Sequence, residues 1–343
     1  MTGSGSGGVQ ARRLDGFDDP ALGRDGWRHL VQSSGSDIVY RTWEWQRAWW
    51  ETFGTGELLL LAAERDGDIV ALAPFYAEEG GIYFLGSNEE ADNLDFIGAT
   101  GDVEVLAALL DGARAAVPNF ACFELHFLPE RSATLAALGP AAARHGLKLR
   151  QSWDLAAPAV DLAGLDEAAL GSLVERKSWL KRERYFKSHG DLEVRHFRDG
   201  AAIRPHLEEF FAQHVERRAR RAYRNPFGEQ AGRHFFERLT TLAADTGWLR
   251  FTRIDWRGRP LAFHYGFCHR GRYVWAEPTF DITLANRSPG QVLLRQLLLA
   301  AAAEGAHTFD LGSNDQPFKL EIATRIDRVH GYSLYPTTQG GAP

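Results

Sequence analysis

Hydrophobic and polar residues alternate along two stretches of the chain in a way that predicts two copies of one unit. GELLLLAAERDGDIVALAPFY (56–76) and GWLRFTRIDWRGRPLAFHYGF (247–267) each read as a strand, a polar turn with glycine and a second strand. An aromatic-rich third strand follows each, GIYFLGS in the first copy and GRYVWAEP in the second. Three positions recur 191 residues apart (258 − 67 = 191): Gly56 and Gly247, Gly67 and Gly258, Ala71 and Ala262. A repeat of this length favours duplication of a domain over a solenoid, whose units span roughly 20–50 residues.

Helical patterns surround these strands in the same order in both copies. WEWQRAWWETFG and GRHFFERLTTLAADTG precede the strands, while VEVLAALLDGARAAV and QVLLRQLLLAAAAEG follow them and lead to the strands FACFELHFL and HTFDLGS. We therefore predict an α/β (α+β) fold of two tandem mixed-sheet domains joined by a helical segment. The predicted boundaries are a flexible tail at 1–12, an N-terminal domain at 13–164 and a C-terminal domain at 165–338 with inserted basic helices.

Composition places this chain among globular proteins without a strong global charge. It has 343 residues, 44% of them hydrophobic, and a net charge of −6, so no overall field attracts nucleic acid or membrane. Cys122 and Cys268 lie in strand-like runs without metal-site or disulfide spacing. No apolar signal core opens the sequence, and no uncharged apolar stretch approaches the ~20 residues of a membrane helix. We therefore expect a cytoplasmic protein without a metal and without membrane insertion.

The segment NRSPGQVLL opens a leucine-rich helix with unusually bare backbone amides. Ser288 is the predicted N-cap, accepting an amide proton through its hydroxyl. Gly290 has no Cβ to block a ligand, and the N–H groups of Gln291 and Val292 have no partner inside the helix. With the positive end of the helix dipole and the charge of Arg287, this helix start predicts a phosphate cradle. An ordinary capped helix is the alternative.

Acid–base groups lie in the strands before this helix. Alternation in LAFHYGFC puts His264 on a face of small residues, which we expect to form an open groove, and the aromatic residues on the other face. His264 could take a proton from an attacking ammonium, because its ordinary pKa is near neutrality; a hydrogen-bonded structural histidine is the alternative. Glu277 ends the next strand and Asp281 follows it, so either could bind or deprotonate an amine. For Asp281 a turn or cap is the competing role.

The segment FDLGSNDQPFK (309–319) closes the predicted site. Asp310 lies among apolar strand residues and needs a partner, which we expect to be an arginine if its role is structural. Lys319 follows on the next helix, where its ammonium could stabilise developing negative charge or remain a solvated surface group.

Five segments together resemble the GNAT acyltransferases, in the CelD-like and FemAB-like branch that carries two GNAT-type units in tandem. They are FFAQHVERR (210–218), GRPLAFHYGF (258–267), YVWAEPTFD (273–281), SPGQVLL (288–294) and FDLGSNDQPFK (309–319). They span roughly 210–320, and the duplication extends the likeness to most of the chain. The resemblance implies acyl-CoA as donor, with its pyrophosphate on the helix start at 288–292 and its pantetheine arm between two strands that splay apart.

The resemblance also implies roles for single residues. We expect strand amides beside Trp275 and Ala276 to bind the oxyanion, and Lys319 to contact an acyl carbonyl or phosphate, as a lysine recurs there in the FemAB-like group. One departure concerns the phosphate loop, whose usual form is Arg/Gln-x-x-Gly-x-Gly/Ala. In Arg287-x-x-Gly290-x-Val292 the last small residue is missing, which leaves open whether CoA sits differently or the donor is another molecule.

The N-terminal copy lacks an equivalent phosphate site. Its loop GSNEEADNLDFIGATGD carries five carboxylates, those of Glu89, Glu90, Asp92, Asp95 and Asp102, and negative charge repels phosphate. We predict that this copy does not bind the donor and instead frames the acceptor pocket. Asp92, Asn93 and Asp95 are candidates for a cationic or hydroxylated acceptor, and a solvated acidic loop is the alternative.

Basic residues concentrate between the copies. Residues 175–224 hold fourteen Lys and Arg against eight Asp and Glu (14 − 8 = +6), so the remainder of the chain carries −12. Eleven of the fourteen crowd two predicted helices: Arg176, Lys177, Lys181, Arg182, Arg184 and Lys187, then Arg217, Arg218, Arg220, Arg221 and Arg224. They fit amphipathic helices with cationic surfaces, or an anionic partner: the 3′-phosphate of CoA, an anionic acceptor, or tRNA.

We predict an N-acyltransferase that moves an acyl group, acetyl in the first instance, from acyl-CoA to an amine. The acceptor would be a small molecule or a cell-surface sugar precursor, and His264 or Glu277 would remove the proton. One alternative is a FemAB-like enzyme whose donor is aminoacyl-tRNA. The other is a non-catalytic GNAT pair that serves as a binding module.

Overall fold

The protein, described here from a computed structural model, divides into two units. The structure describes residues 8–87, 91–219 and 226–337. Unit 1 comprises Met1–Ala156 and Asp327–Pro343, and unit 2 is Ala157–Ile326. The chain leaves unit 1 along strand β7 (Leu147–Asp161) and returns to it along β13 (Arg325–Pro336). The sequence analysis placed 165–338 in one domain, whereas the residues from Asp327 onward pack with unit 1.

Unit 1 is a mixed sheet with helices packed on it. Its sheet runs β1-β2-β3-β4-β6-β13-β7, and β5 adds to β3. β4 and β6 are parallel, and helix α3 connects them. The elements not yet given are β1 (Gln10–Arg13), α1 (Gly23–Ser33), α2 (Trp43–Phe53), β2 (Glu57–Arg65), β3 (Asp68–Glu78), β4 (Gly81–Phe84), β5 (Ile97–Gly98), α3 (Val103–Ala116), β6 (Cys122–Pro129) and α4 (Thr134–Arg144).

Unit 2 repeats this order and adds elements at its beginning. Its sheet runs β7-β12-β11-β10-β9-β8, and β11 and β12 form the parallel pair, connected by α10. The added elements are α5 (Glu167–Val174), α6 (Lys177–His189), β8 (Leu192–Phe197) and α7 (Gly200–Ile203). The repeated ones are α8 (Leu207–Ala219), α9 (Gln230–Leu242), β9 (Leu249–Trp256), β10 (Arg259–His269), β11 (Arg272–Phe280), α10 (Pro289–Ala303), β12 (Thr308–Asp310) and α11 (Pro317–Ile322), with a 3-10 turn η4 (Ile282–Arg287) before α10.

The backbone turns carry the predicted repeat. Each unit has two hairpin turns with two consecutive positive-φ residues, as a type I′ turn requires. They are Asp66–Gly67 and Glu79–Gly80 in unit 1, and Arg257–Gly258 and Arg270–Gly271 in unit 2, each pair 191 positions apart (258 − 67 = 191). Strand register repeats too, since Ala71 pairs with Ala63 and Ala262 with Ile254. The second copy therefore preserves the turns of the meander and the pairing at these positions.

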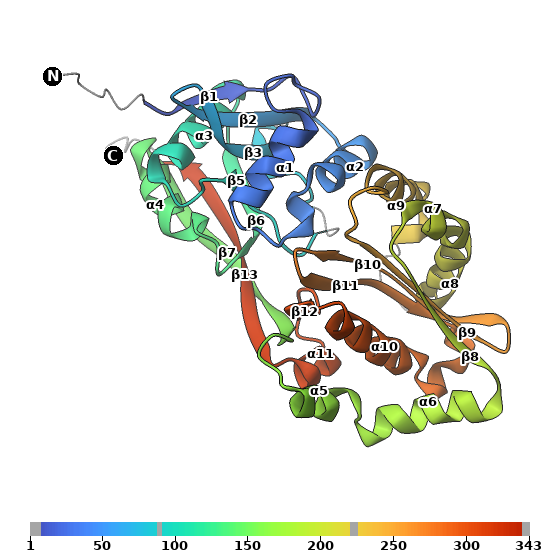
Figure 1. Cartoon of the computed structure of the whole chain (residues 1–343). Helices are drawn as coiled ribbons and strands as arrows, with labels where there is room; N and C mark the ends of the chain where they lie inside the picture. The colour runs from blue at the N-terminus through green and yellow to red at the C-terminus, as the bar shows by residue number, and fades with distance from the viewer. Residues whose placement is uncertain (1–7, 88–90, 220–225, 338–343) are drawn as a thin grey trace. The chain divides into compact units, whose positions relative to one another are not determined.

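Helices cover both faces of the unit 2 sheet (Figure 1). On one face Phe263 and Tyr265 pack on α8 and α9, with ring centroids 6.2 Å from Phe210 and 4.9 Å from Phe236. The opposite face packs on α10, whose Leu293 and other buried leucines share a core with Tyr273 and Trp275. The alternation predicted for β10 is thus confirmed.

Strand β8 is an element that the sequence analysis interpreted as part of a helical segment. It pairs with β9 as the edge of the sheet, from Leu192 opposite Trp256 to Phe197 opposite Phe251. Its side chains alternate between half-buried and exposed, as in Glu193 and Val194. Six residues of weak alternation give too little local signal, and the pairing with β9 defines the strand.

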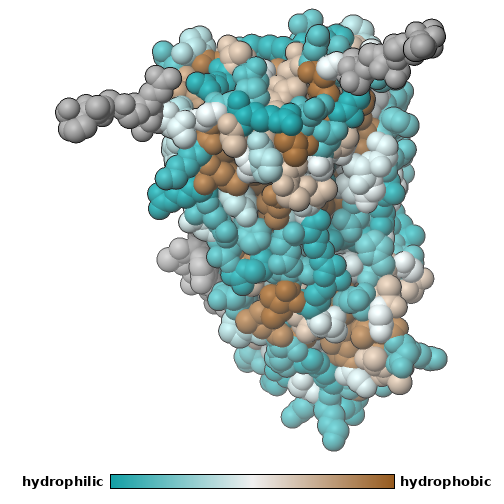
Figure 2. All heavy atoms as spheres, turned by 90° about the vertical axis from the view of Figure 1, so that its left-hand side faces the viewer, coloured by the Kyte–Doolittle hydropathy of each residue, from teal (hydrophilic) through white to brown (hydrophobic). Residues whose placement is uncertain are grey.

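One face of the molecule is mostly polar (Figure 2). On the face drawn in Figure 2, hydrophilic side chains predominate and hydrophobic atoms lie in small separate groups. The large hydrophobic side chains exposed within the described residues are Leu155, Phe318, Leu320, Ile326 and Tyr335. In the described parts of the chain, no helix has the length and hydrophobicity needed to cross a membrane.

Candidate active site

The start of α10 differs from the predicted cap in its backbone. Ser288 is left-handed (φ 54°, ψ 54°), and its hydroxyl makes no capping hydrogen bond. The prediction of a hydroxyl cap was therefore wrong: the Ser288 carbonyl accepts the Gln291 N–H at 3.0 Å instead. No described residue accepts the Gly290 N–H, and Pro289 has none to donate. The predicted free N–H of Gln291 was therefore wrong, and the first turn presents the Gly290 N–H at the positive end of a 15-residue helix.

The side chains of this turn point into unit 2 and leave its backbone uncovered. A Cβ on Gly290 would lie 3.2 Å from the Phe280 ring, so glycine is needed here for packing as well as for access. Val292 is fully buried with the core leucines. Valine in place of the family's last small residue therefore fills the core and does not cover the helix start.

Helix α6 places an aromatic ring, that of Tyr185, beside Arg287 at this helix start. The Arg287 guanidinium lies 4.3 Å from the ring centroid of Tyr185. Two bonds of the Arg295 side chain hold α6 and α5 to α10: one to the buried Glu183 carboxylate at 2.6 Å, the other to the Val174 carbonyl at 2.8 Å. Arg287 is exposed, so its charge is available to an anion beside the α10 start.

Strands β11 and β12 pair only over a short length and then separate. The parallel register joins Arg272, Tyr273 and Val274 to 308–310, and in the described residues it continues no further. β11 runs on to Phe280, so its edge toward β12 is unpaired from Trp275 onward. This is the separation that the resemblance implied, and it leaves the edge beside Trp275 and Ala276 open for backbone hydrogen bonds.

A β-bulge in β11 decides where Glu277 points. Tyr265 lies opposite Glu277, whereas Phe267 lies opposite Val274, so β11 has one extra residue between these pairs. A bulge reverses the alternation that follows it. Trp275 therefore stacks on His264 at 5.5 Å on the α10 face, while Glu277 lies on the α8 face.

Glu277 contacts the helix on that face. Its Oε2 lies 3.1 Å from Nε2 of His214 and 3.9 Å from a guanidinium nitrogen of Arg218, both on α8. Arg217 donates to the carbonyl of Pro278 at 2.5 Å. Glu277 remains 23% exposed, so it can meet a substrate. The sequence analysis gave His214 no role, yet Leu207, Phe210 and Phe211 mark the apolar stripe of α8 on which it lies.

His264 lies in the core and not in an open groove, so the predicted groove was wrong. It is 0% exposed, between the rings of Trp275 and Tyr273. Both ring nitrogens lack a hydrogen bond of good geometry to the described residues. Burial lowers the pKa of His264 to about 3, and the nearby Val274 carbonyl offsets only part of this effect. The imidazole is therefore neutral at physiological pH and, being on the α10 face, is separated by the sheet from Glu277.

Asp281 caps the turn that precedes α10. Its carboxylate accepts the backbone N–H of Thr283 at 2.9 Å and the Thr283 hydroxyl at 2.6 Å. This is the competing role considered for Asp281. The contacts hold the η4 turn, and so help to fix the position of Arg287 and the start of α10.

The segment after β12 holds Lys319 inside the protein. Lys319 is only 6% exposed, and its Nζ donates to the Ser313 carbonyl at 3.2 Å. A solvated surface lysine is thereby excluded.

Asp310 pairs with Arg272 at 3.0 Å, which confirms the expected arginine partner. Because β11 and β12 are parallel, Glu277, Lys319 and the α10 start belong to the same end of the sheet, as the βαβ connection requires.

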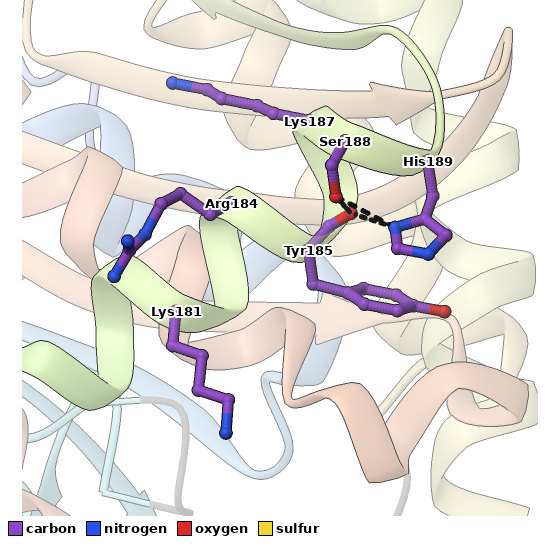
Figure 3. A pocket seen from close by; sticks show the side chains of 6 residues that line it. All are labelled: Lys181, Arg184, Tyr185, Lys187, Ser188 and His189. Carbon is purple, nitrogen blue, oxygen red and sulfur yellow. Dashed lines mark hydrogen bonds between the residues drawn. The ribbon is translucent and has the colours of Figure 1, made fainter.

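An open hollow of about 740 Å³ lies along α6 (Figure 3). Its lining residues are Lys181, Arg184, Tyr185, Lys187, Ser188 and His189. The Tyr185 and His189 rings stack at 4.3 Å, whereas the charged ends of the lysines and the arginine spread in different directions (Figure 3). Such a surface suits an extended anion better than a single phosphate. Arg220, Arg221 and Arg224 of the predicted basic cluster lie outside the described residues.

In unit 1 the residues proposed for an acceptor have structural partners. Asp95 is 1% exposed and accepts from Arg41 at 2.6 Å, from Thr134 at 2.5 Å and from Ser132. An acceptor role for Asp95 is therefore excluded by burial. Asp92 and Asn93 are half-buried, and Glu89 and Glu90 lie outside the described residues. Within the described part, no cluster of His, Cys, Asp or Glu could hold a metal ion.

Comparisons with known proteins agree with this geometry. Residues 175–320 match the acetyltransferase (GNAT) domain family. No curated protein matches the sequence. Among solved structures, FemX aligns over 92% of this chain and 96% of its own, with 13% identity and a TM-score of 0.67.

Two further structures extend the comparison. L-PGS from Bacillus licheniformis aligns over 86% of this chain and 91% of its own, with 13% identity and a TM-score of 0.53. A tandem GNAT protein from the clavulanic acid biosynthesis pathway aligns over 97% and 100%, with 11% identity and a TM-score of 0.51. At such identities the likeness is one of fold, and it confirms the predicted class of two tandem mixed-sheet domains.

Proposed function

We propose that this chain, an acyltransferase of the GNAT superfamily with two units of that fold, transfers an acyl group from acyl-CoA to an amine. Acetyl is the simplest acyl group, and the acceptor is a small molecule or a cell-surface sugar precursor. One observation carries the proposal: the Gly290 N–H, which has no acceptor among the described residues, lies at the start of α10, at the end of the sheet where β11 separates from β12. The tandem GNAT protein from the clavulanic acid pathway, whose structure is described as being without AcCoA, supports the choice of this donor class.

In this proposal, unit 2 binds the donor through its backbone. The Gly290 N–H, the positive end of the α10 dipole and the Arg287 guanidinium hold the donor phosphates. The unpaired edge of β11 receives the pantetheine arm, and amides beside Trp275 and Ala276 bind the carbonyl oxygen as it gains charge. Lys319 supplies a nearby ammonium that favours the same charge.

Glu277 is the proposed base. It takes a proton from the attacking ammonium, which leaves a neutral amine whose lone pair attacks the thioester carbon. The tetrahedral intermediate then expels the thiolate and loses the second proton of the amine nitrogen; this proton converts the thiolate to the free thiol, and Glu277 releases the first proton to solvent. The products are an amide and CoA, and no covalent enzyme intermediate forms. His264 and Asp281, the other candidates, are held in the core and in a turn cap respectively.

Calorimetric titration with acetyl-CoA and CoA tests donor binding. Arg287→Glu should weaken binding at least ~10-fold, because a charge-assisted contact to phosphate is lost. Gly290→Glu should weaken it further, although its side chain also meets Phe280. The matched control is Arg270→Glu, at the far end of α10 in a turn where unit 1 has Glu79 in the same conformation. Equal binding by Arg287→Glu and the wild type would contradict the proposal.

A second candidate function is aminoacyl transfer from tRNA. The cationic hollow along α6 favours it, and so do the names of two structural neighbours, FemX and L-PGS. Binding of aminoacyl-tRNA should fall steeply with salt, by roughly 10³-fold or more between 50 and 200 mM for six or more phosphate contacts. Binding of acetyl-CoA should change far less. A protein that binds neither donor would be a non-catalytic binding module.

A further inference from the structure

His214 is a buried imidazole that the proposed reaction does not yet use. It is 0% exposed on α8 and lies among aromatic rings, with centroids 5.9 Å from Phe210 and 4.6 Å from Phe227. Its Nε2 lies 3.1 Å from the Glu277 carboxylate. Its Nδ1 has no hydrogen-bond partner among the described residues. Such a site would suit a phenylalanine, and an unpaired polar atom in it lowers stability.

We propose that His214 is the positioning residue of Glu277, which rests on the proposed function in that Glu277 is its base. The bulge in β11 turns Glu277 toward α8, and the Nε2–H of His214 then fixes one carboxylate oxygen. The second oxygen remains for the substrate ammonium. His214 acts through Glu277 and does not take the proton itself, because its ring is 0% exposed and cannot meet the substrate.

The neighbouring arginines make this a defined arrangement. Arg217 holds the backbone of β11 at Pro278, and Arg218 lies 3.9 Å from the same carboxylate oxygen as His214. Both contacts come from the turn of α8 next to His214, so one helix fixes the strand and orients its acid. An arginine alone at 3.9 Å leaves the carboxylate free to rotate, whereas a hydrogen bond at 3.1 Å sets its plane.

Kinetics with acetyl-CoA and a panel of amines test the role. His214→Phe fits the aromatic surroundings but removes the donor, and it should lower kcat ~10²-fold with little change in KM for acetyl-CoA. His214→Gln restores an N–H near Nε2 and should recover activity to within ~10-fold of the wild type. Thr240→Val is the matched control, because Thr240 is an equally buried polar residue on α9 that bonds to Tyr265 and not to Glu277. An unimpaired His214→Phe, or a His214→Gln no better than it, would overturn the role.

A second measurement does not depend on turnover. In ¹⁵N-histidine spectra, the His214 signal, assigned by its loss in His214→Gln, should show a proton on Nε2 and none on Nδ1. Glu277→Gln should shift this signal, while Thr240→Val should not. The opposite tautomer, or no response to Glu277→Gln, would refute the pairing even in a protein that is active. A correct tautomer in a protein without acyl transfer would instead count against the proposed function alone.

Discussion

The two units share strands, turns and register, yet the helices that follow their third strands begin differently. In unit 1, the Asp102 carboxylate caps α3, accepting the N–H groups of Glu104 at 2.8 Å and Val105 at 3.4 Å, and also pairs with Arg65. In unit 2, Ser288 leaves the start of α10 without a side-chain cap. A carboxylate in the first position satisfies the helix internally and opposes an anion. The capping residue therefore distinguishes the two helix starts: Asp102 caps α3, whereas Ser288 leaves the start of α10 able to bind phosphate.

The third strands differ as well. β4 ends at Phe84, and pairing with β3 resumes only at β5, whereas β11 continues to Phe280 through its bulge. At the common offset of 191, Glu277 corresponds to Gly86 and His264 to Ala73. The candidate chemistry thus lies in positions where unit 2 departs from its partner. The two units share the scaffold and differ in the residues at this end of it.

The largest expected effect comes from Glu277, a carboxylate that unit 1 lacks at the corresponding position, Gly86. Glu277→Gln should lower kcat by ~10²–10⁴-fold, the contribution typical of a general base, with donor affinity nearly unchanged. Steady-state kinetics with acetyl-CoA measure it. Glu79→Gln, an exposed turn position of unit 1, is the control and should have no effect. If the Glu277→Gln enzyme were as fast as the wild type, Glu277 would not be the base.

The next effect concerns acid stability. A buried histidine whose pKa falls from 6.5 to about 3 stays neutral in the folded state, while the unfolded chain binds a proton below 6.5. Stability is therefore lost as the pH falls through this range, by about 2 kcal/mol for His264 between pH 6.5 and 5. His264→Ala, the residue of unit 1, should remove this part of the pH dependence in urea unfolding. An identical slope in both proteins would show that His264 is not shielded from water.

The helix starts offer a direct comparison of stability. Asp102→Ala removes a cap and should lower the free energy of unfolding by about 1–2 kcal/mol. Ser288→Ala should change it by less than ~0.5 kcal/mol, since the Ser288 hydroxyl caps nothing. Denaturant unfolding of both variants would show the difference. A larger loss for Ser288→Ala than for Asp102→Ala would reverse the distinction between the units.

The smallest effects should be equal in the two units. Gly67→Ala and Gly258→Ala each put a Cβ on a left-handed residue (φ 91° and 71°) in matching turns. We expect each to cost about 1 kcal/mol. Unfolding measurements in which one variant costs several times more than the other would show that the duplicated hairpins no longer carry equal strain.

Local patterns predicted much of this fold but not its long-range pairings. The glycine positions and the period-two alternation were sufficient for the meanders, because both report backbone geometry directly. β8 and the return of β13 into unit 1 depend on which strand lies beside them. No window of sequence contains that information.

The site shows the same limit. The helix start could be predicted because proline at the first helical position, here Pro289, is a signal visible in sequence. The left-handed conformation of Ser288 could not be predicted in this way. Strict alternation also failed at the bulge, which puts His264 and Glu277 on opposite faces. The pairing of Glu277 with His214 joins residues 63 positions apart (277 − 214 = 63), and it became visible only in three dimensions.

The path of the chain has a consequence for synthesis on the ribosome. All of unit 2 leaves the exit tunnel before the strand residues from Asp327 onward, which pair with β6 of unit 1. Unit 1 is therefore translated first and completed last. A premature stop just before Asp327 would remove an interior strand from the half of the protein encoded earliest, while sparing every candidate catalytic residue.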